Sequence, residues 1–558
     1  MAKTDHKRKY FITRILPVLL LFVFFSGARF GGGDDDIYTQ INKNMDIFGR
    51  VYREVALNYV DEVIPDKFMQ AGIDGMLNTL DPYTNFIDAS RKDEVDLLTT
   101  GKYGGVGISI AKKDSGIIIT DVMEGYSAQR EGIKSGDMIL EIDGVSMEGK
   151  NPGDVRTYVK GPTGTQLKMK IKRGERILDF TLTREEIQLK NVTYKGMLEG
   201  GIGYIKLERF SRYAANEIAD ALTELKSKGE LKGVILDLRD NPGGLMDAAV
   251  SILNKFVDKG SLVLTTRGRK LDSEKKFFSV EEPMLGKDVP IVLLVNQNTA
   301  SASEIVAGAI QDLDRGVLVG TKTFGKGLVQ VIDPLSYDDQ LKITTQKYFT
   351  PSGRWIQAKN YFKENKYGVF KPDPYYNQTT FKTLDGRTVY AEGGITPDTI
   401  VNPSANNELL EVLNTQDMYY RFADKYVSEN PDVNGFVWND NIINSFYNFL
   451  TEQNFDYTSK AEKDLADLKL IVADKKYSDK TRTYVADLET ELKSGKLADF
   501  DVSKPQIKAQ LITEILKKYG KSDKEITDAT MSEDTQIQAA LSVIKDRQLY
   551  NSFLSAAR

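Results

Sequence analysis

The chain has 558 residues, of which 41% are hydrophobic and 28% charged, and its formal net charge is −5. At roughly 150 residues per domain, this length predicts three or four folded units. The negative charge argues against a general nucleic-acid-binding protein, which normally carries an excess of basic residues. Because the sequence has no cysteine, it excludes disulfides, thiol catalysis and cysteine-bound metals.

The sequence contains one histidine, His6, which lies in a basic N-terminal tail. A Ser-His-Asp or Cys-His catalytic arrangement is therefore excluded, and a zinc site built from histidines is not expected. Any hydrolytic chemistry must take its general base from Lys, Asp, Glu or Tyr.

Residues 1–28 have the features of an export signal or an N-terminal anchor. Basic residues precede an unbroken apolar run at 15–25, and the small residues Ser26 and Ala28 follow it. The run has the length of a signal-peptide core and is shorter than the ~20 residues of a membrane-spanning helix. We expect the folded body to be exported to the cell envelope, either periplasmic or anchored and facing the periplasm. Membrane contact is expected only through this segment, if it stays uncleaved.

Residues 37–100 alternate apolar and polar positions with helical spacing, which predicts a small N-terminal helical domain. Residues 103–184 instead contain short β-rich runs, such as 116–122 and 167–172, separated by glycine-bearing turns. This change of pattern predicts a separate β-rich domain.

A glycine-rich loop opens this β-rich domain and includes Gly105, Val106, Gly107 and Ile108. Consecutive backbone N–H groups in such a loop can converge on the carboxylate of a peptide. A β-meander without a ligand would show a similar glycine loop. The ordered series of turns over residues 103–184 resembles the circularly permuted PDZ domains of bacterial proteases. The resemblance implies that an extended C-terminal peptide adds as a strand beside these four residues.

From 190 to 402, apolar strands alternate with helical stretches, which predicts an α/β layered fold. The strands at 234–238 and 291–295 lack polar alternation and are expected to be buried on both faces. Residues 405–558 are more polar, with helical patterns at 460–472 and 481–492. We expect a helical C-terminal region there, of unknown role.

Ser301 follows the strand at 291–295 and precedes an apolar helical run. A serine on such a strand–turn–helix connection lies beside the free N–H groups of the first helical turn, which can stabilise an oxyanion. The pattern Ser301-x-x-Glu304 is also that of a capping box, in which the serine only caps the helix. This segment alone leaves both interpretations open.

Lys326 lies between two glycines after another apolar strand. A solvated lysine, with a pKa of ~10.4, is a poor base, but burial in an apolar pocket can make its amine neutral. Such an amine could take the proton of Ser301, with Gln330 holding the lysine nitrogen. Residues 320–326 also fit the start of a phosphate-binding loop. However, its last position, which needs Ser or Thr for magnesium, is Gly327.

A turn with the sequence Asn-Pro-Gly-Gly, residues 241–244, follows the strand at 234–238. Ligands of open α/β sheets usually bind at this carboxyl edge. As structure alone, the sequence makes a good turn. As function, the N–H of Gly243 or Gly244 would pair with that of Ala302 to bind an oxyanion.

These motifs together resemble the carboxyl-terminal processing peptidases, or tail-specific proteases. The resemblance rests on residues 241–244, 301–304, 324–330 and 393–398, which agree in order and spacing, and it covers about 37–402. It implies a crotonase-like α/β protease core, at 190–402, with an inserted PDZ-like domain.

The resemblance also implies roles for individual residues. Ser301 would be the nucleophile, Lys326 the base and Gln330 the residue that orients it, with the oxyanion held by the Gly243 and Ala302 backbones. Asp312, eleven residues after the nucleophile, is an auxiliary acid in some descriptions of the family, but it fits equally well as an ordinary helix residue.

The implied substrates are exported proteins with flexible, apolar C-termini, cut through a serine acyl-enzyme without metal, nucleotide or other cofactor. The alternative function is a catalytically silent PDZ scaffold of the cell envelope. A degenerate enzyme of that kind should have lost Ser301, Lys326 or the glycine turn, and all are present. The sequence leaves open whether the chain forms a homo-oligomer or binds an adaptor protein.

Overall fold

The computed structural model describes residues 34–555, except 114–115, 360, 362–378, 403–406, 433–435 and 474–475. The predicted export segment lies outside the described residues. The chain divides into two compact units between Phe86 and Ile87. No described helix has the length and apolar content needed to cross a membrane.

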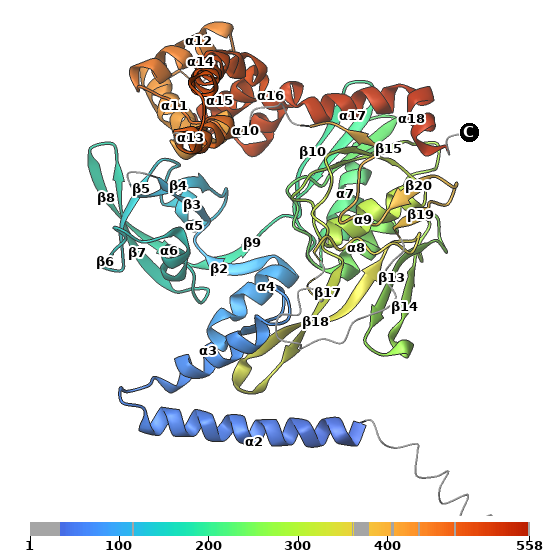
Figure 1. Cartoon of the computed structure of the whole chain (residues 1–558). Helices are drawn as coiled ribbons and strands as arrows, with labels where there is room; N and C mark the ends of the chain where they lie inside the picture. Colours follow the sequence, from blue (N-terminus) through green and yellow to red (C-terminus); the bar gives the residue numbers. More distant parts are fainter. Residues whose placement is uncertain are drawn as a thin grey trace, which may run out of the picture. The chain divides into compact units, whose positions relative to one another are not determined.

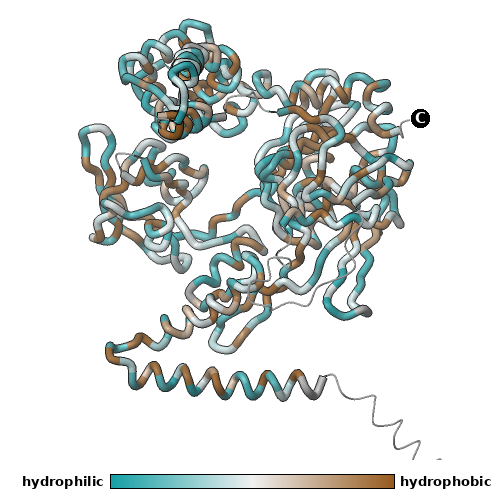
Figure 2. The backbone as a smooth tube through the Cα atoms, in the orientation of Figure 1, coloured by the Kyte–Doolittle hydropathy of each residue, from teal (hydrophilic) through white to brown (hydrophobic). Residues whose placement is uncertain are grey.

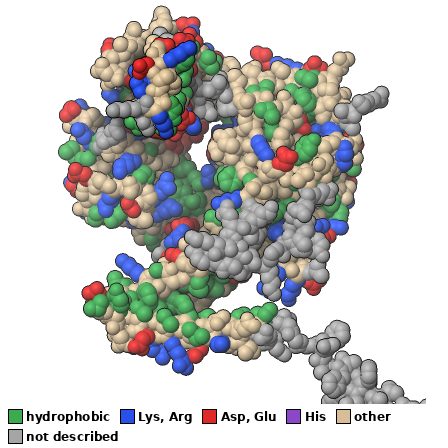
Figure 3. All heavy atoms as spheres, in the orientation of Figure 1, with side chains coloured by type: hydrophobic (Ala, Val, Ile, Leu, Met, Phe, Trp, Pro, Cys, Tyr) green, Lys and Arg blue, Asp and Glu red, His purple; other side chains and the backbone are tan. Residues whose placement is uncertain are grey.

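The first unit contains α2 (Asp34–Asn58) and α3 (Pro65–Leu77), which confirms helices in this stretch. Tyr52 on α2 stacks on Phe68 of α3, with ring centroids 5.6 Å apart. Figure 3 shows hydrophobic side chains on the surface of these helices, and Figure 2 shows brown and teal alternating along α2. The predicted domain at 37–100 does not form one body, because α4 (Lys92–Thr100) belongs to the second unit.

The β-rich domain predicted from glycine turns is present in the second unit (Figure 1). Its main sheet has the order β3-β4-β5-β7-β8, with β6 beside β5, and a separate pair joins β2 and β9. The elements are β2 (Lys102–Gly105), β3 (Ile108–Lys113), β4 (Gly116–Val122), α5 (Ser127–Arg130), β5 (Met138–Ile142), β6 (Val145–Ser146), α6 (Pro152–Val159), β7 (Gln166–Arg173), β8 (Arg176–Thr183) and β9 (Glu185–Gln188).

The α/β fold predicted for 190–402 is built on a sheet of order β10-β11-β12-β15-β16-β21. The strands from β11 onward run parallel, and β10 is antiparallel to β11. Its elements are β10 (Val192–Leu198), β11 (Ile202–Leu207), α7 (Ala214–Ser227), β12 (Gly233–Asp237), α8 (Met246–Leu253), β15 (Ile291–Val295), α9 (Ala302–Asp312), β16 (Val317–Gly320) and β21 (Thr399–Ile400). Every residue of β12 and β15 is buried, as their apolar sequences predict.

A second sheet contains the antiparallel strands β17, β18, β13 and β14. Their bounds are β13 (Leu262–Gly268), β14 (Lys275–Phe278), β17 (Leu328–Pro334) and β18 (Gln340–Phe349); β1 (Asn85–Ile87), β19 (Thr380–Lys382) and β20 (Thr388–Tyr390) are short strands.

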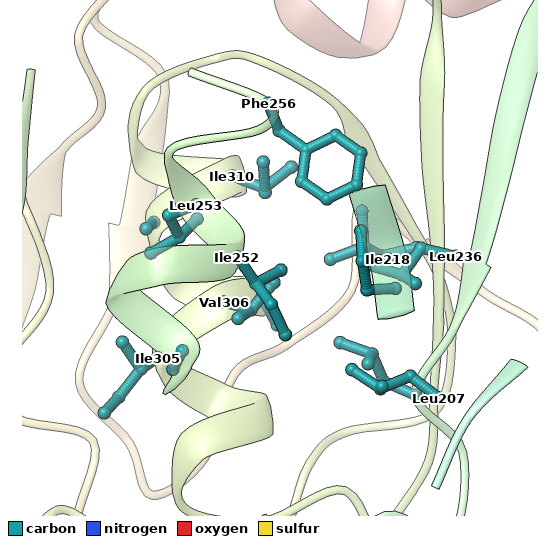
Figure 4. Close-up of a cluster of buried hydrophobic side chains, with 14 of the residues drawn as sticks. Leu207, Ile218, Leu236, Ile252, Leu253, Phe256, Ile305, Val306 and Ile310 are labelled. Atoms are coloured by element: carbon teal, nitrogen blue, oxygen red, sulfur yellow. The ribbon is translucent and has the colours of Figure 1, made fainter. Parts of the chain in front are cut away.

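The hydrophobic core on one face of the parallel sheet is formed with α7, α8 and α9 (Figure 4). Ile218 of α7, Ile252 of α8 and Val306 of α9 meet the strand residues Leu207 and Leu236 in this cluster. Apolar side chains recur at helical spacing on these helices, so each presents one stripe to the sheet. This packing places the start of α9, where Ser301 lies, at the carboxyl edge of the strands.

The described residues of the expected helical region at 405–558 are divided among four hydrophobic clusters. Its first part has its own core, while α17 and α18 pack on the other face of the parallel sheet. The helices are α10 (Asn407–Thr415), α11 (Met418–Glu429), α12 (Asp440–Glu452), α13 (Lys460–Val472), α14 (Asp479–Val502), α15 (Lys504–Lys518), α16 (Asp523–Thr530), α17 (Thr535–Lys545) and α18 (Arg547–Leu554). The end of the chain therefore completes the α/β core, which polarity alone did not indicate.

Replacing Ile544 of α17 by alanine tests this packing. Ile544 is buried against the sheet, so we expect Ile544→Ala to lower the free energy of unfolding by about 2–5 kcal/mol. Urea unfolding measures the effect, with Ser542→Ala, at an exposed position of the same helix, as the control. Equal stability of the two variants would contradict the assigned packing.

Candidate active site

Ser301 immediately precedes α9 and has an unusual backbone conformation, with φ 56° and ψ −116°. Such strained conformations persist only where the surrounding structure enforces them, and they cluster at functional sites. The Ser301–Glu304 capping box that the sequence predicted is present, and its Glu304 side chain accepts the Ser301 N–H. The N–H groups of Glu304 and Ile305 also donate to the Ser301 carbonyl. The cap and the nucleophile are therefore compatible interpretations, and the strained backbone of Ser301 is the observation that favours a nucleophile.

The Glu304 carboxylate connects this turn to the loop that carries Lys326. One carboxylate oxygen, Oε2, accepts the backbone N–H of Ser301 at 2.9 Å and that of Lys326 at 2.8 Å. The other oxygen accepts the Thr323 hydroxyl at 2.6 Å and the Gly325 N–H at 2.7 Å. The two predicted catalytic residues are thus held through their backbones on one oxygen atom.

Glu304 is fully buried, and no basic side chain donates to it among the described contacts. Burial raises the pKa of Glu304 from 4.5 to about 7, although its four hydrogen-bond donors act in the opposite direction. The sequence predicted Glu304 only as the partner of Ser301 in a capping box. Its position three residues after the candidate nucleophile could have indicated a role in the site, but its contacts with Thr323 and Gly325 depend on tertiary structure.

The loop that carries Lys326 is held by two hydrogen bonds of the next residue, Gly327. The N–H of Gly327 donates to the Gln357 side chain, and the Trp355 indole donates to the Gly327 carbonyl. Gln330, predicted to orient the lysine, lies on β17 and donates its side-chain N–H to the Thr344 hydroxyl at 3.0 Å. The bond from Gln330 to Lys326 stays a prediction.

The glycine turn predicted to contribute to an oxyanion hole lies directly against the start of α9. A Cβ added to Gly243, which has φ +95°, would be 2.8 Å from the Ala302 nitrogen and 3.0 Å from the Ser301 Cβ. Within the described part of the chain, no hydrogen bond uses the Ala302 N–H. The Gly243 N–H donates to the side-chain oxygen of Asn241 at 2.9 Å.

The same turn is anchored to the segment before Ser301. The Asn241 carbonyl accepts the Ala300 N–H and the Ser303 hydroxyl, and the Thr299 hydroxyl donates to the Leu238 carbonyl. These bonds fix the glycine turn relative to Ser301. The structure therefore brings Ser301, Ala302 and Gly243 together, as the sequence predicted.

Asp312 is the last residue of α9, at the opposite end of the helix from Ser301. Its carboxylate forms a buried ion pair with Arg354 at 2.7 Å and accepts the Ser352 N–H. These contacts hold the end of the helix. The auxiliary acid role therefore receives no support from its described contacts.

The four residues predicted to bind peptide form the passage from β2 to β3. Gly105 pairs with Glu185 of β9, and the carbonyls of Val106 and Gly107 accept N–H groups from the domain core. Ile108 begins β3, which ends the strand order of its sheet. Among the described residues, β3 therefore has a strand on one side only, and an added strand could pair with the other edge.

Comparison with known proteins identifies relatives over most of the chain. Residues 201–367 match the model of Peptidase family S41, residues 94–172 the PDZ domain, and residues 409–544 the C-terminal helical domain of probable PDZ-proteases. A carboxy-terminal-processing protease of Bartonella bacilliformis is 38% identical over 323 residues, which cover 57% of this chain and 73% of that protein. A probable CtpA-like serine protease of Staphylococcus aureus is 34% identical over 387 residues, covering 68% and 75%.

The solved structure of a photosystem II D1 C-terminal processing protease is 25% identical to this chain. It covers 64% of this chain and 88% of its own length, with a TM-score of 0.36.

Gly243→Ala tests the role of the glycine turn. The added Cβ would lie beside the Ala302 N–H, so we expect hydrolytic activity to fall by ~100-fold or more. The unfavourable φ should also cost about 1–2 kcal/mol of stability. Gly260→Ala is the control in kinetic assays, because Gly260 has φ +87° but open space around its Cβ position. Equal activity of the two variants would exclude the proposed contact.

Glu304→Gln tests the carboxylate that connects the Ser301 and Lys326 segments. An amide would turn its own N–H₂ group toward two of the four donors, each mismatch costing roughly 1–3 kcal/mol. We expect activity to fall because the two segments lose their common anchor. Steady-state kinetics and urea unfolding measure the two effects, with Glu533→Gln as a control near the C-terminus.

The variant should also change the dependence of stability on pH. Because the pKa of Glu304 is higher in the folded chain, its stabilising contribution is full below about pH 4.5 and is lost as pH rises through about 7. This loss should be absent in Glu304→Gln. Urea unfolding at several pH values across this window tests the effect, and an unchanged pH dependence would contradict the assignment.

Proposed function

The chain belongs to peptidase family S41, the carboxy-terminal-processing proteases, and from this premise we propose that Ser301 is its nucleophile and Lys326 its general base. The chain is thus a serine-type endopeptidase with a PDZ domain. The observation that supports the two assignments most is the shared Glu304 oxygen, which holds the backbones of both residues.

In the proposed reaction, the neutral amine of Lys326 takes the proton of the Ser301 hydroxyl as the serine oxygen attacks the scissile carbonyl. The tetrahedral intermediate collapses to an acyl-enzyme when the leaving amine receives this proton. Water then attacks the ester by the reverse sequence of proton transfers. With one histidine in the whole sequence, at position 6, lysine is the base that fits this chemistry.

The developing oxyanion would be bound by the Ala302 N–H and by a second backbone donor from the glycine turn. The Gly243 N–H can serve once its bond to the Asn241 side chain is broken, and the Gly244 N–H is the alternative. Donors of this kind stabilise charge that develops only in the transition state, so they raise kcat rather than substrate affinity.

We also propose that the PDZ domain binds the flexible, apolar C-termini of protein substrates. The second edge of β3 could accept the tail as an added strand, while α6 lies near β3. Ile108 and Ile110 of β3 and Val155 and Val159 of α6 belong to the same apolar cluster. Val155 and Val159 are buried, so the partly buried side chains of Ile108 and Ile110 are the ones that could favour an apolar tail over a charged one.

The proposed location is the cell envelope, outside the cytoplasm. The support is the basic N-terminus followed by the apolar run at 15–25, both of which lie outside the described residues.

Cleavage of a disordered reporter with an apolar tail tests the proposed chemistry. The parent should cleave it, whereas Ser301→Ala and Lys326→Arg should be inactive, because arginine keeps the charge but cannot act as a base near neutral pH. An identical reporter ending in aspartates should be cleaved more slowly if the PDZ domain selects apolar tails. Activity of Lys326→Arg would exclude the lysine base, and equal cleavage of both reporters would exclude tail selection.

A further inference from the structure

A partly buried ionic cluster lies at the carboxyl end of β12 and includes residues from the C-terminal helical region. The Arg239 guanidinium binds the Asp237 carboxylate at 2.6 Å and the Asp534 carboxylate at 2.8 Å. The same Arg239 Nη1 donates to the side-chain oxygen of Gln536 at 3.0 Å. The Tyr204 hydroxyl completes the cluster by donating to Asp237 at 2.6 Å.

Asp534 caps a helix in addition to binding Arg239. It is the N-cap of α17, where its carboxylate accepts the backbone N–H groups of Gln536 and Ile537 at 3.0 Å. The helix that it caps is fixed to the parallel sheet by buried residues such as Val543 and Ile544. The carboxylate that meets Arg239 is therefore mounted on a helix packed against the core.

Arg239 lies at the start of the turn that contains the proposed oxyanion donor. It follows the last residues of β12, and Asp240, Asn241, Pro242 and Gly243 come directly after it. Asp240 has φ +59°, a left-handed conformation that the surrounding contacts must hold in place. Gly243 lies four residues after Arg239, so a shift of Arg239 would act on this turn over a short stretch of backbone.

Asp534 supplies one of the two carboxylates that pair with the Arg239 guanidinium. The Asp237 side chain is buried, whereas the side chains of Arg239 and Asp534 are 16% and 29% exposed. Without Asp534, one amino group of the guanidinium would keep only the neutral oxygen of Gln536. Arg239 would keep its pairing with Asp237 but lose the second of its two carboxylate partners, and its partly exposed side chain could then move toward water.

We infer that Asp534 is a positioning residue for catalysis, which acts through Arg239 on the turn that carries Gly243. The inference rests on the proposed function of that turn as part of the oxyanion hole. It gives the C-terminal helix α17 a part in the catalytic core, in addition to covering the sheet.

Asp534→Asn in the full chain separates this role from helix capping. Asparagine caps a helix as well as aspartate does, so the substitution removes the charge that faces Arg239 and keeps the cap. We expect kcat for the tailed reporter to fall by ~10-fold or more, with little change in KM, because displacement of a transition-state donor affects the chemical step. Glu533→Gln is the matched control, since Glu533 is a neighbouring acid that pairs with Lys508 instead.

A peptide boronic acid that forms a covalent adduct with the serine provides a second measurement. Its affinity depends on the oxyanion donors and should fall in parallel with kcat in Asp534→Asn. Gln536→Met leaves the Asp534 charge in place and should give a smaller loss in the same direction. It also keeps the test decisive if Asp534→Asn does not fold.

The outcomes separate this inference from the proposed function. An active parent with an inactive Ser301→Ala variant establishes the serine chemistry independently of Asp534. If folded Asp534→Asn and Gln536→Met then keep the kcat and boronic acid affinity of the parent, the inference is overturned. The same result holds if only their melting temperatures fall, because Asp534 would then act in stability alone.

Discussion

The Glu304 carboxylate is the constraint on which the geometry of the proposed active site depends. The nucleophile lies at the start of a helix and the base lies on a separate loop, so other contacts must fix the distance between them. The reactive side chains themselves must stay free of structural hydrogen bonds. Here the backbone N–H groups of Ser301 and Lys326 share one oxygen of a buried carboxylate. The side chains are left for chemistry, and four donors offset part of the desolvation that burial costs, although the pKa of Glu304 stays raised.

The glycine turn opposite this carboxylate is fixed from two directions. Toward α9, the carbonyl of Asn241 binds the segment that leads into Ser301. Toward the sheet, Arg239 pairs with the buried Asp237 and the partly exposed Asp534. Burial of an ion pair contributes little net stability, but removal of one partner is expensive, so such clusters specify one arrangement of their segments.

The C-terminal helices extend this arrangement to the end of the chain. The parallel sheet is covered by α7, α8 and α9 on one face and by α17 and α18 on the other. Because apolar strands such as β12 and β15 are buried on both faces, the sheet needs both layers. The chain must therefore return to the protease core after the preceding helical region, which makes its last helices part of the catalytic domain.

The sequence by itself determined the kinds of layers and the chemistry available to them. The apolar strands at β12 and β15, the glycine turns of the PDZ domain, and the placement of Ser301 and Gly243 at strand ends all follow from local pattern. A single histidine at position 6 restricted the choice of base. Tertiary structure alone decided the contacts of Glu304 with Thr323, Gly325 and Lys326, the pairing of Asp312 with Arg354, and the return of Asp534 to Arg239. These contacts join residues far apart in the chain, and local periodicity and turn propensity carry no information about which distant partner a buried polar group will meet.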